Sequence, residues 1–283
     1  MGVFAGTNVD LNKNRSNLIL QLDAANYDSY SGIGTSWNDL ASNTNFTLTN
    51  CTFNQTEIVG NGTNAYIESN SNIDLSTYSN FSIVFGVKSS NYSTESVLLE
   101  YGLSNYFYYF PTSIATLGHT ALQETATGIS SFSPVYNTTS ITTLGHTPLQ
   151  ETATGISSFN ALKNNGFLLK IENNSIISNT VIDNKIYPIS SNTINTTTHN
   201  LISVVYSDLN TSSSSVSMYQ GNSLVGTVGL TTSISFSNSI AYLLSIGSVN
   251  KLSNSAIKYF SIYNKNISSS EVTSIRAAYG SRT

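Results

Sequence analysis

The acidic side chains are the first residues to examine for chemistry, because a glycoside hydrolase needs two carboxylates facing the same bond. A retaining enzyme of this kind holds them about 5 Å apart, one as acid and one as nucleophile. On a strand the motif would be Glu-x-Asp-x-Glu, and the chain contains none. Glu95 and Glu100 are five positions apart, so we expect them on opposite faces of a strand. Glu124 and Glu151 each stand alone in Thr-rich sequence. The sequence therefore predicts no catalytic residues and no enzyme.

Histidine and cysteine are the usual zinc ligands. None of His119, His146 and His199 has a carboxylate within four residues, so no zinc site is predicted. The single Cys51 excludes an internal disulfide and a cysteine-based metal site. We expect it to be a buried or half-buried small residue.

Aspartates raise the question of calcium, which takes six to eight oxygen ligands, usually with several carboxylates. Asp23, Asp28 and Asp39 are close in sequence, and Asp208 lies in a turn. The alternative is that Asp23 and Asp39 accept hydrogen bonds from nearby backbone in Asx turns. Because carboxylates are sparse, we favour the turns and predict no metal ligands, with calcium as the one cofactor left open.

Aromatic side chains are the candidate sugar-binding residues. Trp37 and Tyr66 could each stack on a sugar ring, although a lone Trp beside a strand more often belongs to the core. A run of five rings puts at least two on each face of any strand, so either both faces are covered or one is an exposed apolar patch. The cover would be either the core or another subunit. We leave both alternatives open for this candidate interface, which consists of Tyr106, Phe107, Tyr108, Tyr109 and Phe110.

The elements that must position these residues are expected to be strands. Of the 283 residues only 9% are charged, and 17 Tyr and 12 Phe favour strands, while Asn, Ser and Thr disfavour helices. Short apolar runs bounded by Asn, Gly and Ser predict an all-β sandwich or barrel. The expected strands are Leu18–Leu22, Phe46–Phe53, Glu57–Val59, Ala65–Glu68, Phe81–Lys88, Ser96–Tyr101, Gly166–Glu172, Ser175–Ile182, Asn200–Tyr206, Ser215–Tyr219, Ser223–Val228, Ala241–Gly247 and Ala256–Tyr263.

Two local signals stand out against this background. Gln220-Gly221-Asn222 separates two of the expected strands and suits a hairpin. Ser268-x-x-Glu271 has the form of a capping box ahead of apolar residues at helical spacing, which predicts one short C-terminal helix ending at Gly280.

The middle of the chain contains a tandem duplication. Residues 116–132 and 143–159 differ only at Ala121 and Pro148, with an offset of 27 residues. Two copies are too few for a solenoid. We therefore interpret about 105–165 as an insertion into a sandwich of residues 17–283, preceded by an extended arm of residues 1–16. The insertion is either a tolerated surface duplication or a pair of equivalent contact surfaces.

Charge and hydropathy argue against nucleic acid and membrane as partners. A net charge of −4 and a pI near 5.3, with no basic run, argue against nucleic acid. No stretch reaches the roughly 18 apolar residues of a membrane span. The first residues lack the cationic and apolar regions of a signal peptide.

Three stretches resemble one known family. Residues 18–50 contain an apolar strand, Leu-Asp-Ala, a Trp-x-Asp-Leu turn and a Thr-Leu-Thr-Asn strand. Residues 60–67 resemble a family turn and strand, with Asn in place of both acids, and residues 256–279 resemble its last strand and closing helix. Residues 200–228 also resemble the family's hairpin. The family is the concanavalin A-like lectin/glucanase (laminin G-like) module common in tailed-phage virion proteins.

The resemblance implies an antiparallel two-sheet jelly-roll sandwich and a place on a virion. We therefore expect a non-enzymatic capsid decoration protein, minor capsid protein or fibre, present as a homo-oligomer or in many copies. Its expected partners are the major capsid protein or tail components, with host glycans as further ligands. The alternative is a carbohydrate-binding adhesin or tail-fibre lectin, and a glycoside hydrolase ranks third because one sandwich fold hosts all three.

Overall fold

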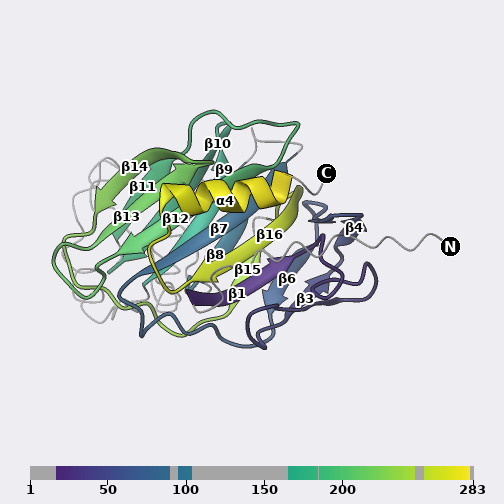
Figure 1. The fold of residues 1–283 in the computed structure, drawn as a ribbon, viewed down its shortest axis with the longest axis horizontal. Coiled ribbons are helices and arrows are strands. Elements are labelled where there is room, and N and C mark those ends of the chain that lie inside the picture. Colours follow the sequence, from purple (N-terminus) through teal and green to yellow (C-terminus); the bar gives the residue numbers. More distant parts are fainter. Residues whose placement is uncertain (1–16, 90–94, 104–164, 184, 246–251, 281–283) are drawn as a thin grey trace, which may run out of the picture. The chain divides into compact units, whose positions relative to one another are not determined.

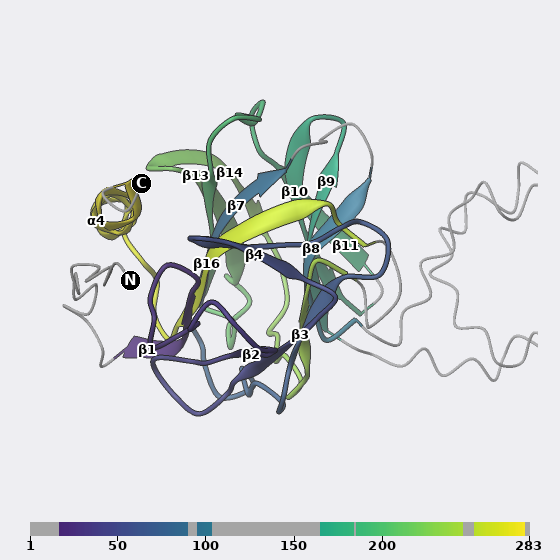
Figure 2. The ribbon, with the colours of Figure 1, turned by 90° about the vertical axis from the view of Figure 1, so that its right-hand side faces the viewer.

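The structure is a computed structural model that describes residues 17–89, 95–103, 165–183, 185–245 and 252–280. Within them the chain forms two antiparallel sheets that face each other across a core (Figure 1, Figure 2). This confirms the predicted all-β, two-sheet architecture. No helix of the described part is both long and apolar enough to cross a lipid bilayer.

Each sheet contains eight strands, and all strand pairs within each sheet are antiparallel. Sheet A has the order β14 (Ser223–Gly229), β13 (Ser215–Gln220), β12 (Asn200–Ser207), β7 (Phe81–Ser89), β16 (Ser255–Tyr263), β5 (Glu57–Val59) and β4 (Thr52–Asn54), and β1 (Leu18–Asp23) also pairs with β16. Sheet B has the order β11 (Lys185–Ser190), β10 (Ser175–Ile182), β9 (Gly166–Glu172), β8 (Ser96–Tyr101), β15 (Ala241–Leu243), β6 (Tyr66–Ser69), β3 (Phe46–Thr49) and β2 (Ser36–Trp37).

Strand positions follow the sequence prediction with four corrections, of which the first is the unexpected two-residue strand β2. The expected strand 46–53 is two strands in different sheets, because Asn50 has φ 51° and turns the chain from β3 into β4. Strand β11 was missed because Pro188 lowers strand propensity, and the structure places it at the edge of sheet B, where proline is tolerated. The expected strand 241–247 ends at Leu243, where Leu244 adopts φ 65°.

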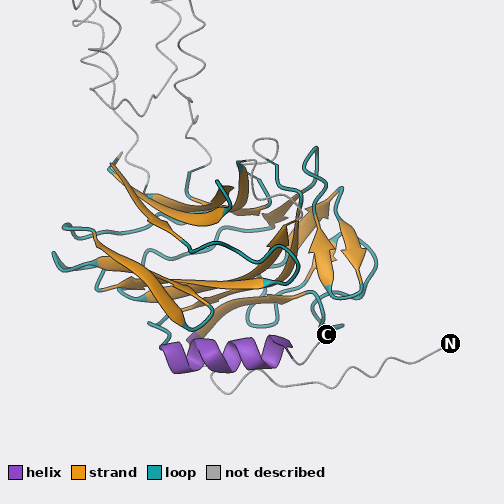
Figure 3. Ribbon diagram, turned by 90° about the horizontal axis from the view of Figure 1, so that it is seen from above, coloured by secondary structure: helices purple, strands orange, loops and turns teal. Residues whose placement is uncertain are grey.

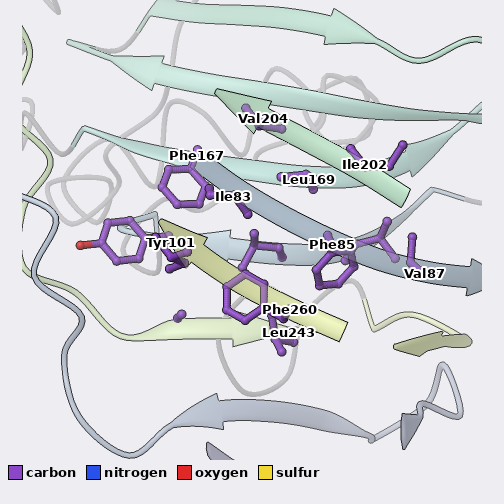
Figure 4. Close-up of a cluster of buried hydrophobic side chains, with 14 of the residues drawn as sticks. Ile83, Phe85, Val87, Tyr101, Phe167, Leu169, Ile202, Val204, Leu243 and Phe260 are labelled. Carbon is purple, nitrogen blue, oxygen red and sulfur yellow. The ribbon is translucent and has the colours of Figure 1, made fainter. Parts of the chain in front are cut away.

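The core lies between the sheets and is built by strand alternation. Ile83, Phe85 and Val87 point inward from β7 and meet Phe167 and Leu169 of β9 (Figure 4). At one end, aromatic rings from both sheets are in contact, and the ring centroids of Tyr206 in sheet A and Phe167 in sheet B are 5.6 Å apart. Within sheet B, Phe167 also stacks on Tyr101, with ring centroids 4.9 Å apart and ring planes nearly parallel. Because alternate side chains of each strand are buried in this layer, the remaining side chains must point to the outer face of each sheet.

The predicted C-terminal helix is confirmed as α4 (Ser269–Gly280). The Ser268 backbone N–H donates to Glu271 at 2.8 Å, which is the reciprocal bond of a capping box. The helix packs on the outer face of sheet A (Figure 3), where Val272 is fully buried against a small apolar cluster that includes Val84 and Tyr259. The helix therefore covers part of the outer face of sheet A.

The long insertion connects two neighbouring strands. Tyr101 at the end of β8 is the Cα partner of Phe167 near the start of β9. A Cβ added to Gly102 would lie 2.9 Å from the carbonyl oxygen of Asn165, so the two ends of the insertion are in contact. The duplicated segment therefore leaves and re-enters sheet B at a single point.

Candidate functional site

Trp37 lies in the core. It is fully buried, and its strand β2 alternates an exposed Ser36 with an inward Trp37. No face of the indole is open to a sugar, so the sugar-stacking prediction for Trp37 is wrong and its alternative, a core residue, is correct. The physical reason is the pairing of Trp37 with Phe46, which aims both rings between the sheets.

Several predicted features lie outside the described residues. They are the arm of residues 1–16, the duplicated segment with His119, His146, Glu124 and Glu151, and the candidate interface of Tyr106, Phe107, Tyr108, Tyr109 and Phe110. Their roles stay predictions.

The aspartates Asp23 and Asp39, considered above for calcium, accept backbone hydrogen bonds. Asp39 Oδ1 accepts the N–H groups of Gln21 at 2.8 Å and Ala41 at 2.9 Å. Asp23 Oδ1 accepts the N–H of Ala25 at 3.1 Å. The bonds from Ala25 and Ala41 are those of the Asx-turn interpretation, whereas Gln21 lies 18 residues from Asp39 on β1. Within the described ranges no three His, Cys, Asp or Glu side chains gather in a metal-binding arrangement.

Cys51 is half-buried and unpaired, as expected. Burial raises the pKa of its thiol to about 12, against the smaller opposing effect of a hydrogen bond to the Thr49 carbonyl. The thiol therefore stays protonated and is not an activated nucleophile.

A charged cluster lies on the outer face of sheet A. Lys88 Nζ is 3.2 Å from Glu57 Oε1, and His199 Nε2 is 2.9 Å from Glu57 Oε2. Burial lowers the pKa of His199, and the neighbouring carboxylate of Glu57 acts in the opposite direction. The sequence did not reveal this cluster because its members come from distant strands. It links β5 and β7 to the start of β12.

The outer face of sheet B carries a continuous polar row. Across the strands, Thr47 is the Cα partner of Glu68, Glu68 of Tyr242, and Tyr242 of Glu100. The strand neighbours of these residues fill the core, so their own side chains point away from it. Four adjacent strands thus place a hydroxyl, two carboxylates and a phenol side by side. We call Thr47, Glu68, Tyr242 and Glu100 the sheet B row.

Tyr66 stands next to this row. It lies two residues before Glu68 on β6, so the two side chains share a face. Its side chain is half-buried, as is that of Tyr242. Tyr66 is also close enough to contribute to the raised pKa of Tyr242. Of the two predicted sugar-binding residues, Tyr66 is therefore the one on an accessible face.

Tyr242 and Glu68 are joined by a hydrogen bond. The phenol donates to Glu68 Oε1 at 3.0 Å. Burial, and then this bond and the surrounding acids, raise the pKa of Tyr242 to about 12. The phenol accordingly remains a donor at neutral pH. A carboxylate has about four acceptor positions, so Glu68 can accept hydroxyl groups of a ligand as well.

The two carboxylates of the row are poorly placed for hydrolysis. Glu68 and Glu100 are separated by one strand, which puts their backbones about 10 Å apart. Glu100 is fully buried, and its Oε1 accepts the Leu103 N–H at 2.6 Å. A general acid must instead reach the leaving-group oxygen. The arrangement suits holding a polar ligand, with the tyrosine rings as apolar platforms.

The expected placement of Glu95 and Glu100 on opposite faces is wrong. A register shift between Val97 and Leu99 inserts one residue into β8 and reverses the alternation. Glu95 therefore lies on the outer face as well, 3.2 Å from Lys170 Nζ.

Sequence reasoning missed Glu68 and Tyr242. The available signal was the alternation of β6, where Tyr66 and Glu68 flank the apolar Ile67. Nothing local showed that Tyr242, from a strand far along the chain, would lie beside Glu68.

Comparison with known proteins identifies a fold rather than a family. No family model matches the chain, and no curated protein matches it. Among solved structures, the binding domain of Paraclostridial Mosquitocidal Protein 1 superposes with a TM-score of 0.57 at 15% identity, covering 94% of this chain and 53% of that one. The binding domain of botulinum neurotoxin DC in complex with SialylT superposes with a TM-score of 0.55 at 11% identity, covering 95% and 52%.

A third structure comes from work on botulinum neurotoxin type C, whose cell entry depends on interaction with two ganglioside molecules. It has a TM-score of 0.53 at 10% identity and covers 95% of this chain and 52% of that one. The chain has the β-sandwich fold of these binding domains. It spans about half the length of each.

Proposed function

We propose that this chain is a non-catalytic carbohydrate-binding module, and that Tyr66, Glu68 and Tyr242 on the outer face of sheet B contact the glycan. The observation that carries the proposal is the pairing of two half-buried tyrosines with a hydrogen-bonded carboxylate on one sheet face. Apolar ring faces with a few fixed polar groups are the usual composition of a small-ligand site.

The structural neighbours support this proposal over a purely structural role. Two of the three are described as binding domains of toxins, one of them in complex with SialylT, and the third is described through the interaction of its toxin with two ganglioside molecules. The position of the site on this chain rests on its own residues, because identity to these proteins is too low to transfer one.

A glycan array followed by calorimetry on the full chain tests the proposal. We expect binding to at least one glycan, weakened about tenfold or more by Tyr66→Ala or Tyr242→Ala, since a buried aromatic contact contributes over 1 kcal/mol. Tyr27→Ala is the matched control, because Tyr27 is 78% exposed on a loop outside this face. Binding that ignores both site variants would contradict the site, and an empty array would contradict the function.

We propose a virus particle as the setting of this module. The support is the resemblance to tailed-phage virion modules across residues 18–101 and 166–280. In that setting the chain docks on capsid or tail subunits and presents sheet B outward. Mass spectrometry of purified particles should find the protein in stoichiometric amounts, and its absence there would end this part of the proposal.

The absence of catalysis is also a proposal. It predicts that incubation with any polysaccharide bound on the array releases no new reducing ends. Release that disappears in Glu68→Gln would instead establish a glycosidase.

A further inference from the structure

The sheet B row contains acids and no base. Between β3 and β8 its members are a threonine, two glutamates and a tyrosine. Among the described residues, the lysine of the neighbouring strand on this face is Lys170. It is 3.2 Å from Glu95 and 2.7 Å from Glu172, so two carboxylates already neutralise it. Glu100 is fully buried, so the carboxylate of the row that a ligand would meet is Glu68.

The tyrosine rings reinforce this preference. The face of an aromatic ring is the negative part of its quadrupole and attracts a cation. Tyr66 and Tyr242 lie on the same face as Glu68, one on the same strand and the other on the paired strand. An ammonium group beside Glu68 would therefore gain a charge-assisted hydrogen bond and contact with a ring face.

An acidic sugar gains neither. Its carboxylate or sulfate would be placed next to Glu68, and like charges at close range repel. A neutral sugar would keep ring stacking and ordinary hydrogen bonds. The same three residues thus rank ligands by charge.

We propose that the tyrosine–glutamate site on sheet B selects glycans whose bound sugar carries a free, protonated amine, and that it rejects acidic sugars. This inference rests on the proposed function and names its ligand class. The deciding juxtaposition is Glu68, which is hydrogen-bonded to Tyr242 and lies beside Tyr66 on the same sheet face.

Calorimetry with three tetrasaccharides tests the selection at mildly acidic pH, using the full chain. The probes are oligomers of glucosamine, of N-acetylglucosamine and of galacturonic acid. We expect glucosamine to bind about tenfold more tightly than its N-acetylated form, as a charge-assisted hydrogen bond exceeds a neutral one by that order. Galacturonate should bind most weakly. Added salt should reduce the preference.

Two variants separate the site from general charge attraction. Glu68→Gln should abolish the preference for glucosamine, while Glu172→Gln removes the same charge from the same sheet face and should leave it intact. A thermal melt of each variant shows whether the fold is preserved. If Glu68→Gln fails to fold, Tyr66→Phe serves instead, because it keeps the ring and should keep the preference, whereas Tyr66→Ala should lose it.

The outcomes distinguish this inference from the proposed function. Equal binding of the three probes, or tighter binding of galacturonate, overturns the selection and leaves glycan binding standing. Equal effects of Glu68→Gln and Glu172→Gln also overturn it, as would a tetralysine peptide that binds as tightly as the glucosamine oligomer. No binding of any probe, together with an empty glycan array, overturns both.

Discussion

Single side chains in this protein are governed by partners that lie far away in sequence. His199 follows a run of threonines and has no local acidic neighbour, yet its ring lies beside Glu57 of β5. Trp37 is a similar case, since its cross-strand partner Phe46 directs it into the core. The type of a residue limits the roles that it can have, and its burial in the folded chain decides which of these roles it takes.

His199 leads to a prediction about pH. Because burial lowers its pKa in the folded state, the unfolded chain binds more protons between the folded and unfolded pKa values. The free energy of unfolding should therefore fall as pH drops through about 6.5, the ordinary histidine value, and level off below the folded pKa. Urea titrations at several pH values should show this slope in the wild type and a shallower one in His199→Gln. Equal slopes in the two proteins would contradict it.

Some features of the helices and strands are indicated by neighbouring residues in the sequence, and others are not. The helix α4 begins where its capping box predicts, because both capping partners are within four residues. The bulge in β8 has no such signature, and it moves Glu95 to the outer face. The type of an element is therefore predictable from local sequence, but the sheet face to which each of its side chains points depends on how the strand pairs.

The cap of α4 can be tested by substitution. Ser268→Ala removes the hydroxyl that accepts the Glu271 N–H at 3.3 Å and should reduce the free energy of unfolding by about 1 kcal/mol. Ser274→Ala is the control, as Ser274 is exposed within the same helix and bonds back to the Ser270 carbonyl. We expect the control to change stability by less than about 0.5 kcal/mol. A larger loss from the control than from Ser268→Ala in chemical denaturation would refute the cap's role.

The molecule as a whole combines a closed sandwich with an insertion that enters and leaves at one point. Tyr101 and Phe167, near the two ends of the insertion, are Cα partners in sheet B. All four residues of the sheet B row belong to strands of the sandwich.

Replacing residues 104–164 with a short Asn-Gly turn should therefore preserve folding. Shortening a loop between strands that already pair costs little, because closure entropy varies only slowly with length. We expect a melting midpoint within a few degrees, roughly a 1 kcal/mol effect, and unchanged glycan affinity in the variant. A protein that no longer melts cooperatively would show that the insertion stabilises the sandwich.

Local sequence patterns were enough to predict the all-β class, most strand positions, the β13–β14 hairpin at Gly221 and the helix cap at Ser268. Each of these depends on alternation, a turn residue or a cap within a few positions. The shared row of Glu68, Tyr242 and Glu100, the contact of His199 with Glu57 and the burial of Trp37 became visible in the folded chain alone. Those contacts depend on which strands pair and in what register. Pairing is set by burying one apolar layer between two sheets, and that condition involves the whole chain at once.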